Sequence, residues 1–389
     1  MNSDRLQSKL SQSETMTNEQ DQQSGIAVPA RFAATKPAID RNVRERETLA
    51  SGHKSTIWCH GWRLITRNRF GLLLKIGLSI GLVLLLLGRL ERVALVETLR
   101  SANFGWLALA LVTTLIGKLI SAYRWRTLLE IHEIKLPLRK LISSLFAGSL
   151  LNSVTPSTIG GDLYRAYDTA DASEKRYVTS FVTIFFDRWL GIVALATIAL
   201  LALLPARSLG APVEHLATLV VVIFTLVIAS ALVLFNRRLA TRLTLAFRKM
   251  GLSVIGKRVV WANKTFRQVR EAWKGIVIAA GLAALLQINV VFQYFFISES
   301  LSLEVPLIYL LLVVPVALLI IALPISINGI GLRENVFAYL LAGAGVSLAG
   351  AAALSLIVLA MLLLHSLVGA FILSFRGITT KERFMALWT

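Results

Sequence analysis

The fold is decided by a stretch near the C-terminus, Leu348–Phe375, with the sequence LAGAAALSLIVLAMLLLHSLVGAFILSF. It contains no Asp, Glu, Lys or Arg. An uncharged apolar run of about 18 or more residues is long enough, as a helix, to cross the hydrocarbon core of a bilayer. The stretch therefore predicts a transmembrane helix.

Similar apolar runs recur toward the N-terminus, and two shorter ones lie between them. Of the 389 residues, 56% are apolar and 16% are charged, whereas soluble domains average about 25% charged. We therefore expect an all-α polytopic bundle in the membrane. The other long runs are Gly71–Gly88, Phe104–Tyr123, Val178–Leu204, Leu216–Phe235 and Ile276–Ile297; the shorter ones are Leu141–Val154 and Pro306–Leu323.

The net charge of +19 is explained by loops rather than by nucleic-acid binding. Residues 236–274 hold eleven basic residues and one acidic residue, and such an excess is typical of cytoplasmic loops. The same rule places both termini in the cytoplasm of a cell or inner membrane. Two amphipathic patterns in 236–274 predict helices lying on the cytoplasmic leaflet, and calmodulin-like partner binding is an alternative.

Three segments follow from composition. Residues 1–55 are polar and charged and predict a disordered cytoplasmic tail. Residues 56–376 form the membrane domain, and 377–389 a short cytoplasmic tail. The single cysteine, Cys59, excludes an intrachain disulfide and a cysteine metal cluster. No nucleotide or zinc motif occurs, so we expect no cofactor, no metal and no catalysis.

The loop charges require two short segments to leave one side of the membrane and return to it. Segment 141–177 is broken by Pro156 and by Gly160-Gly161, and segment 306–346 is broken by Pro324 and two further glycines. We therefore predict about six full spans plus two re-entrant hairpins. The hairpins enter from opposite faces, as in the inverted repeats of transporters.

Backbone that is not helical at membrane depth requires a polar interior, so these breaks are candidate binding sites. Glycine allows close backbone approach, and Arg165 and Arg333 are suited to hold a phosphate. Alternatively, the breaks are simple turns whose arginines extend to lipid headgroups. The predicted substrate-binding residues are Gly160, Gly161, Asp162, Arg165, Asp187, Arg188, Asn328, Gly329, Gly331, Arg333 and Glu334.

Charged and polar residues inside spans also indicate a site. Asp187 and Arg188 project about 100° apart on a helix, so each should find its partner on another segment. We expect Asp187 to pair with Arg165 or Arg333, for function or only as a structural ion pair. Other polar residues in spans either line the cavity or join helices by hydrogen bonds: Gln287, Asn289, Gln293 and His365.

Two motifs resemble a known family. They are Asn152-Ser-Val-Thr-Pro-Ser-Thr-Ile-Gly-Gly-Asp-Leu-Tyr-Arg165, followed by Asp187-Arg188, and Leu323-Pro-Ile-Ser-Ile-Asn-Gly-Ile-Gly-Leu-Arg-Glu334. From about Leu72 to Phe375 the chain is similar to the lysylphosphatidylglycerol synthase transmembrane-region family, or flippase-like domain. The resemblance implies movement of lipid between leaflets. The chain ends at Thr389 without an aminoacyltransferase domain, so synthesis of lysyl-lipid is not expected.

Three functions are therefore open. The leading hypothesis is a flippase-like transporter for an anionic or phosphorylated headgroup, with a glycolipid or polyprenyl-linked lipid as cargo and Arg165 and Arg333 on its phosphate. The second is a membrane-embedded transferase or hydrolase that acts on lipid headgroups, with Asp162 or Asp187 as base. The third is a non-catalytic scaffold for a glycosyltransferase complex. Membrane lipids are the expected partners, with a homodimer or a glycosyltransferase as further alternatives.

Overall fold

The computed structural model describes residues 69–155, 159–173, 177–208, 214–236, 238–239, 241–242, 244–245, 272–323, 326 and 329–375. They belong to one compact unit, Arg69–Ala386; the other unit comprises Met1–Asn68 and Leu387–Thr389. Both predicted tails and most of the predicted surface helices in 236–274 lie outside the described residues. So do Pro156, Pro324 and Asn328.

The described residues form helices and no strands, as predicted. Five helices are long and apolar enough to span a membrane: α5, α8, α9, α12 and α15. The predicted span Gly71–Gly88 lies in α3, which contains a shorter apolar stretch, Gly77–Leu86. The helices are α3 (Arg69–Arg89), α4 (Arg92–Arg100), α5 (Phe104–Ile131), α6 (Leu138–Val154), α7 (Ile159–Ser173), α8 (Tyr177–Ser208), α9 (Glu214–Phe235), α12 (Trp273–Ser300), α13 (Leu307–Ile321), α14 (Leu332–Ala342) and α15 (Leu348–Phe375).

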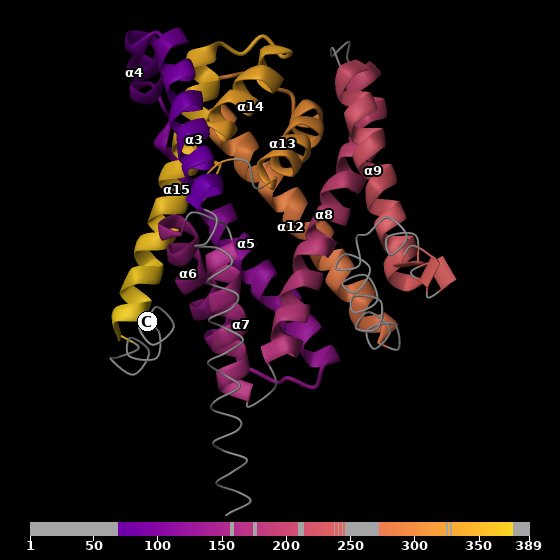
Figure 1. Cartoon of the computed structure of the whole chain (residues 1–389). Helices are drawn as coiled ribbons and strands as arrows, with labels where there is room; N and C mark the ends of the chain where they lie inside the picture. The colour runs from indigo at the N-terminus through magenta and orange to yellow at the C-terminus, as the bar shows by residue number, and fades with distance from the viewer. Residues whose placement is uncertain are drawn as a thin grey trace, which may run out of the picture. The chain divides into compact units, whose positions relative to one another are not determined.

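Helices α5 and α12 pack side by side in opposite directions (Figure 1). At one end the amide of Asn103 donates to the carbonyl of Ser300 at 2.8 Å. At the other end Gly275 lies against the side chain of Ile131. Small residues allow this close approach, as is common between membrane helices; fully buried examples are Ala110, Ala122, Ala279 and Ala283.

Two helical hairpins enter from opposite ends of this pair. The first, α6–α7, begins a few residues after the end of α5, at the Ile131 end. The second, α13–α14, begins a few residues after the end of α12, at the Ser300 end. Figure 1 shows α6 and α7 toward one end of the described helices and α13 and α14 toward the other. The predicted pair of broken hairpins is therefore present.

The contacts repeat when the two halves are exchanged. Helix α6 packs on α15, and α13 packs on α8. Likewise α7 contacts α8 and α14 contacts α15, while α5 contacts α6 and α12 contacts α13. This reciprocity is the arrangement expected of an inverted repeat.

The glycines at the two breaks serve different purposes. In the first hairpin a Cβ atom on Gly161 would overlap the backbone carbonyl of Gly148 in α6, so glycine is needed for close packing of the two arms. In the second, Gly329 and Gly331 have φ of 77° and 79°, a left-handed backbone that glycine adopts without steric cost. The glycines of the two breaks are thus similar in sequence but differ in role: close packing in the first hairpin and left-handed backbone in the second.

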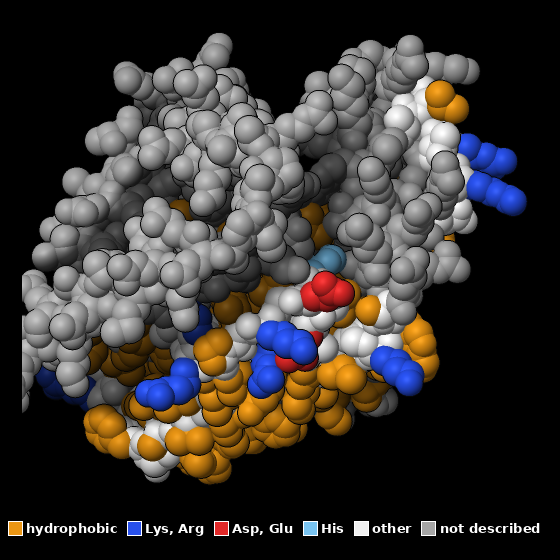
Figure 2. All heavy atoms as spheres, turned by 90° about the horizontal axis from the view of Figure 1, so that it is seen from below, with side chains coloured by type: hydrophobic (Ala, Val, Ile, Leu, Met, Phe, Trp, Pro, Cys, Tyr) orange, Lys and Arg blue, Asp and Glu red, His pale blue; other side chains and the backbone are white. Residues whose placement is uncertain are grey.

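The end at which α6 begins carries exposed basic side chains. Figure 2 views this end and shows Lys and Arg beside hydrophobic side chains, with fewer Asp and Glu. At the opposite end, Glu91, Glu97 and Glu304 are exposed together with Arg100. Exposed basic residues at the α6 end include Arg126, Lys135, Arg139 and Lys274, beside the exposed acidic residues Glu130 and Glu133.

Candidate functional site

A buried ion cluster joins the first hairpin to α5 and α8. Asp187 in α8 is 2% exposed and accepts from Arg124 Nε at 2.6 Å and from Arg165 Nη2 at 3.4 Å. Arg165 also contacts Asp162 at 3.4 Å, and the second oxygen of Asp162 contacts Arg188. Three arginines and two aspartates from three segments therefore form one network. The predicted pairing of Asp187 with Arg165 is confirmed, and Arg188 also finds its partner on another helix.

Arg165 is held from several sides within this cluster. Besides its two carboxylate contacts, its guanidinium carbon lies 4.2 Å from the ring centre of Trp125, a favourable cation–π geometry. Sequence analysis did not single out Arg124, because it follows the apolar run Phe104–Tyr123 and resembles a charge at a span end. It lies instead inside the protein, 6% exposed.

The glycine pair of the first break is also satisfied internally. The amide of Gly161 donates to Asn152 Oδ1 at 2.8 Å, and the hydroxyl of Thr155 donates to the carbonyl of Leu151 at 2.6 Å. Gly160 lies against the side chain of Thr155. The contacts of Gly160 with Thr155 and of Gly161 with Asn152 join the two arms of the hairpin, and the Thr155 hydroxyl bond lies within the end of the first arm.

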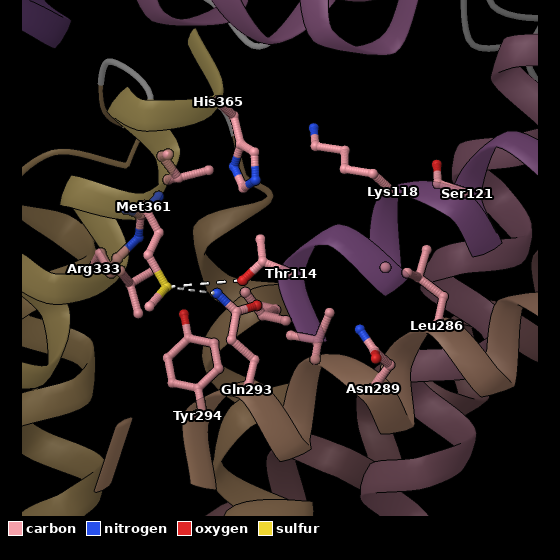
Figure 3. Close-up of a pocket in the computed structure, with 15 residues that line it drawn as sticks. Thr114, Lys118, Ser121, Leu286, Asn289, Gln293, Tyr294, Arg333, Met361 and His365 are labelled. Atoms are coloured by element: carbon pink, nitrogen blue, oxygen red, sulfur yellow. Dashed lines mark hydrogen bonds between the residues drawn. The ribbon is translucent and has the colours of Figure 1, made fainter. Parts of the chain in front are cut away.

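A pocket of about 330 Å³ lies between α5, α12, α13, α14 and α15 (Figure 3). Of the predicted substrate-binding residues, Arg333 lines it, whereas Asp162, Arg165, Asp187 and Arg188 are not among its lining residues. The other polar lining side chains are Thr114, Lys118, Ser121, Asn289, Gln293, Tyr294 and His365. Within the described residues, the lining includes basic groups and no carboxylate.

Lys118 is the cation that sequence analysis missed. It lies midway along α5, and its Nζ donates to Ser149 Oγ of α6 at 2.7 Å and lies 5.6 Å from the ring centre of Phe146. No ion pair joins it to a carboxylate among the residues that the structure describes. A charge at mid-span costs roughly 2.5–3.5 kcal/mol on insertion scales, so Lys118 indicates a function.

His365 of α15 lines the same pocket and is 3% exposed. Neither ring nitrogen has a hydrogen-bond partner within the described part of the chain. The interpretation of His365 as a residue that joins helices by hydrogen bonds is therefore not supported there. A neutral imidazole carries one donor and one acceptor, and neither is used within the described part of the chain.

The side of the pocket formed by α12 is polar and uncharged. Asn289 Nδ2 donates to the carbonyl of Thr113 at 2.9 Å, so Asn289 both joins α12 to α5 and lines the cavity. Gln293 Nε2 contacts only the weak acceptor Met361 Sδ, at 3.5 Å. Gln287, the third polar residue of this span, does not line the pocket.

The two halves of the repeat differ at corresponding places. In the first half, an arginine of α5 and the hairpin arginine converge on the carboxylate of Asp187. In the second half, Gln293 of α12 and the hairpin residue Arg333 line a pocket together with the thioether of Met361. The carboxylate of Asp187 thus lies among the arginines of the first half, whereas Arg333 of the second half lines a cavity.

The second break supports Arg333 through the backbone. The amide of Arg333 donates to the carbonyl of Gly329 at 2.8 Å, and Gly331 packs against α3. Glu334 is 6% exposed and does not line the pocket. Pro324 and Asn328, predicted for this break, lie outside the described residues.

Two comparisons with known proteins bear on this arrangement. Residues 72–369 match the family described as lysylphosphatidylglycerol synthase TM region. The chain is also 31% identical over 144 residues to the UPF0104 membrane protein of Pyrococcus horikoshii, a match that covers 36% of this chain and 42% of that relative. The matched stretch is therefore less than half the length of the relative.

Proposed function

The chain belongs to the lysylphosphatidylglycerol synthase TM region family, and we propose that it moves a lipid with an anionic or phosphorylated headgroup between the leaflets of its membrane. The observation that carries the proposal is Lys118, a buried cation that lines the pocket and is joined to no carboxylate by an ion pair among the described residues. Buried charge is costly unless it is compensated. An anionic headgroup supplies that compensation.

The pocket also has a favourable depth. Lys118, Asn289 and His365 each lie near the middle of a membrane-spanning helix. A headgroup held among them would be about halfway across the hydrocarbon core, where its transfer through lipid alone is least favourable. Binding sites near the midplane, between broken helices of an inverted repeat, are typical of secondary transporters.

Lys118 can exchange its contact with Ser149 for a contact with the headgroup when the pocket becomes occupied. Its present acceptor is the neutral hydroxyl of Ser149. A phosphate oxygen would replace that contact by a charge-assisted hydrogen bond, which is roughly twice as strong as a neutral one. Release of Ser149 would then loosen the contact between α5 and the first hairpin as the headgroup binds.

We also propose how the protein is oriented in the membrane. The end at which α6 begins carries more exposed basic than acidic residues (Figure 2), and basic loops are retained on the cytoplasmic side. On this basis the first hairpin enters from the cytoplasm of a cell or inner membrane, and both ends of the described chain face that side.

The transport proposal is tested by headgroup translocation in proteoliposomes that contain the purified protein and a fluorescent anionic lipid. Lys118→Met is expected to reduce the rate by about 10- to 100-fold, because it removes a charge-assisted contact worth about 1.5–3 kcal/mol. Lys118→Arg should retain most of the rate. Lys135→Met, at an exposed loop position, is the matched control and should translocate as the unmodified protein does.

Equal rates in liposomes with and without the unmodified protein would refute transport. Equal rates for Lys118→Met and Lys135→Met would leave transport intact but exclude the role of this pocket.

A further inference from the structure

We infer that the pocket takes a headgroup in which a phosphate carries an uncharged, hydroxyl-rich group, and that it rejects headgroups that carry an amine. The inference rests on the proposed function, because it assigns the ligand of the same pocket. The inference is narrower than the proposed function, since an anionic headgroup could also be a bare phosphate monoester or an aminoacylated phosphodiester.

The phosphate end is assigned to the side of the pocket formed by Lys118 and His365. Figure 3 shows both side chains on one side of the cavity, away from the residues of α12. His365 is almost completely buried and has no hydrogen-bond partner among the described residues for either ring nitrogen. Buried polar groups in folded proteins are normally hydrogen-bonded. Its orphan nitrogens therefore point to a bound molecule.

The hydroxyl-rich end is assigned to the opposite side, which α12 forms. Asn289, Gln293 and Tyr294 supply amide and phenol groups there (Figure 3). Each can both donate and accept a hydrogen bond, which matches hydroxyl groups. The nitrogen of Gln293 has only a weak sulfur acceptor, so a ligand hydroxyl would improve its hydrogen bonding.

Amine-bearing headgroups meet the wrong charge in this cavity. Lys118 and Arg333 both line a space of about 330 Å³, and no described lining residue is acidic. An ammonium group would therefore meet the like charge of Lys118 and no carboxylate among the described lining residues, an arrangement that opposes binding. Ligand cavities commonly begin at about this volume, so the pocket leaves little room to keep an ammonium group away from Lys118.

The test is equilibrium binding of short-chain lipids to the purified full-length protein in detergent. Dihexanoyl phosphatidylglycerol represents a phosphate with a polyol, and its lysyl ester adds an amine. We expect the lysyl ester to bind more weakly by about tenfold or more, because like charges are brought together. Equal or tighter binding of the lysyl ester would overturn the inference.

A pair of variants tests the hydroxyl-binding side. Gln293→Leu should weaken binding of dihexanoyl phosphatidylglycerol by about 2- to 10-fold and leave dihexanoyl phosphatidic acid, which lacks the polyol, unchanged. Gln287→Leu, in the same helix but outside the pocket, should leave both unchanged. Equal weakening of the two lipids by Gln293→Leu would contradict the assignment of this side to hydroxyl groups.

Binding also separates this inference from transport. Glycerol 3-phosphate has the phosphate and hydroxyl groups of the headgroup but no acyl chains. If it bound tightly and the lipid did not bind, the ligand would be a soluble molecule. That result would refute lipid transport but support the inferred ligand chemistry. Translocation of the lysyl ester at the rate of phosphatidylglycerol would support lipid transport and refute the inferred rejection of amines. Selective lipid binding without translocation would support the ligand class and remove the transport function.

Discussion

Asp187→Asn is expected to destabilise the protein severely, lowering its thermal unfolding temperature in detergent. The carboxylate accepts from Arg124 and Arg165 and is 2% exposed. Removing one partner of a buried ion pair leaves an uncompensated charge and typically costs about 3–5 kcal/mol. Asparagine preserves the volume, so the loss reports charge rather than packing.

Two further variants isolate that cause. Asp168→Asn breaks an ion pair between Asp168 and Lys140 at 2.8 Å that is more exposed, and pairs near the surface are worth about 0–1 kcal/mol. It should therefore unfold close to the temperature of the unmodified protein. Arg124→Gln combined with Asp187→Asn should recover part of the stability. Unfolding of Asp187→Asn at the temperature of Asp168→Asn would show that the cluster does not stabilise the fold.

Gly161→Ala is expected to have the second largest effect, since it separates the two arms of the first hairpin. The added methyl group would overlap the backbone carbonyl of Gly148 and crowd Asn152. A backbone atom cannot move aside as a flexible side chain can, and overpacking of this kind costs about 1–3 kcal/mol or more. Thermal unfolding in detergent measures the loss of stability.

Gly281→Ala is the matched control, because a Cβ atom at Gly281 meets no heavy atom within 4 Å. Alanine there should raise stability by roughly 0.5–1 kcal/mol through its helix preference. If both alanine variants unfolded at higher temperature than the unmodified protein, the close contact between α6 and α7 would be absent.

Run length and loop charge predicted most of the helical architecture. Every predicted apolar run coincides with a helix, although Pro306–Leu323 extends slightly beyond α13, and the two broken runs form hairpins at opposite ends of α5 and α12. The boundaries failed where charge was compensated by tertiary contacts. The span expected to end at Tyr123 continues to Ile131 because Arg124 is paired with Asp187. Helix α4 was not predicted, because it is short and carries charged residues at intervals, so it contains no long apolar run.

The site was harder to predict because contacts between segments decide where each charged side chain lies. The motif similarity of Arg165 and Arg333 suggested equal roles, but Arg165 contacts two carboxylates whereas Arg333 lines the pocket. A contact with substrate stays a prediction for both. Lys118 could have been found, since it interrupts the apolar run Phe104–Tyr123 at mid-span and intramembrane charge is a functional signal. No sequence pattern indicated that His365 would line the same pocket as Lys118.

The central claim, a headgroup site between hairpins that enter from opposite faces, is tested most directly by cysteine labelling. Single cysteines replace Lys135, Ser302 or Ala342, all exposed, in a Cys59→Ser background, and a membrane-impermeant maleimide is added to sealed vesicles. Position 135 begins the first hairpin; positions 302 and 342 flank the second. The account predicts that 302 and 342 label from one side and 135 only from the other. Labelling of all three from the same side would contradict it.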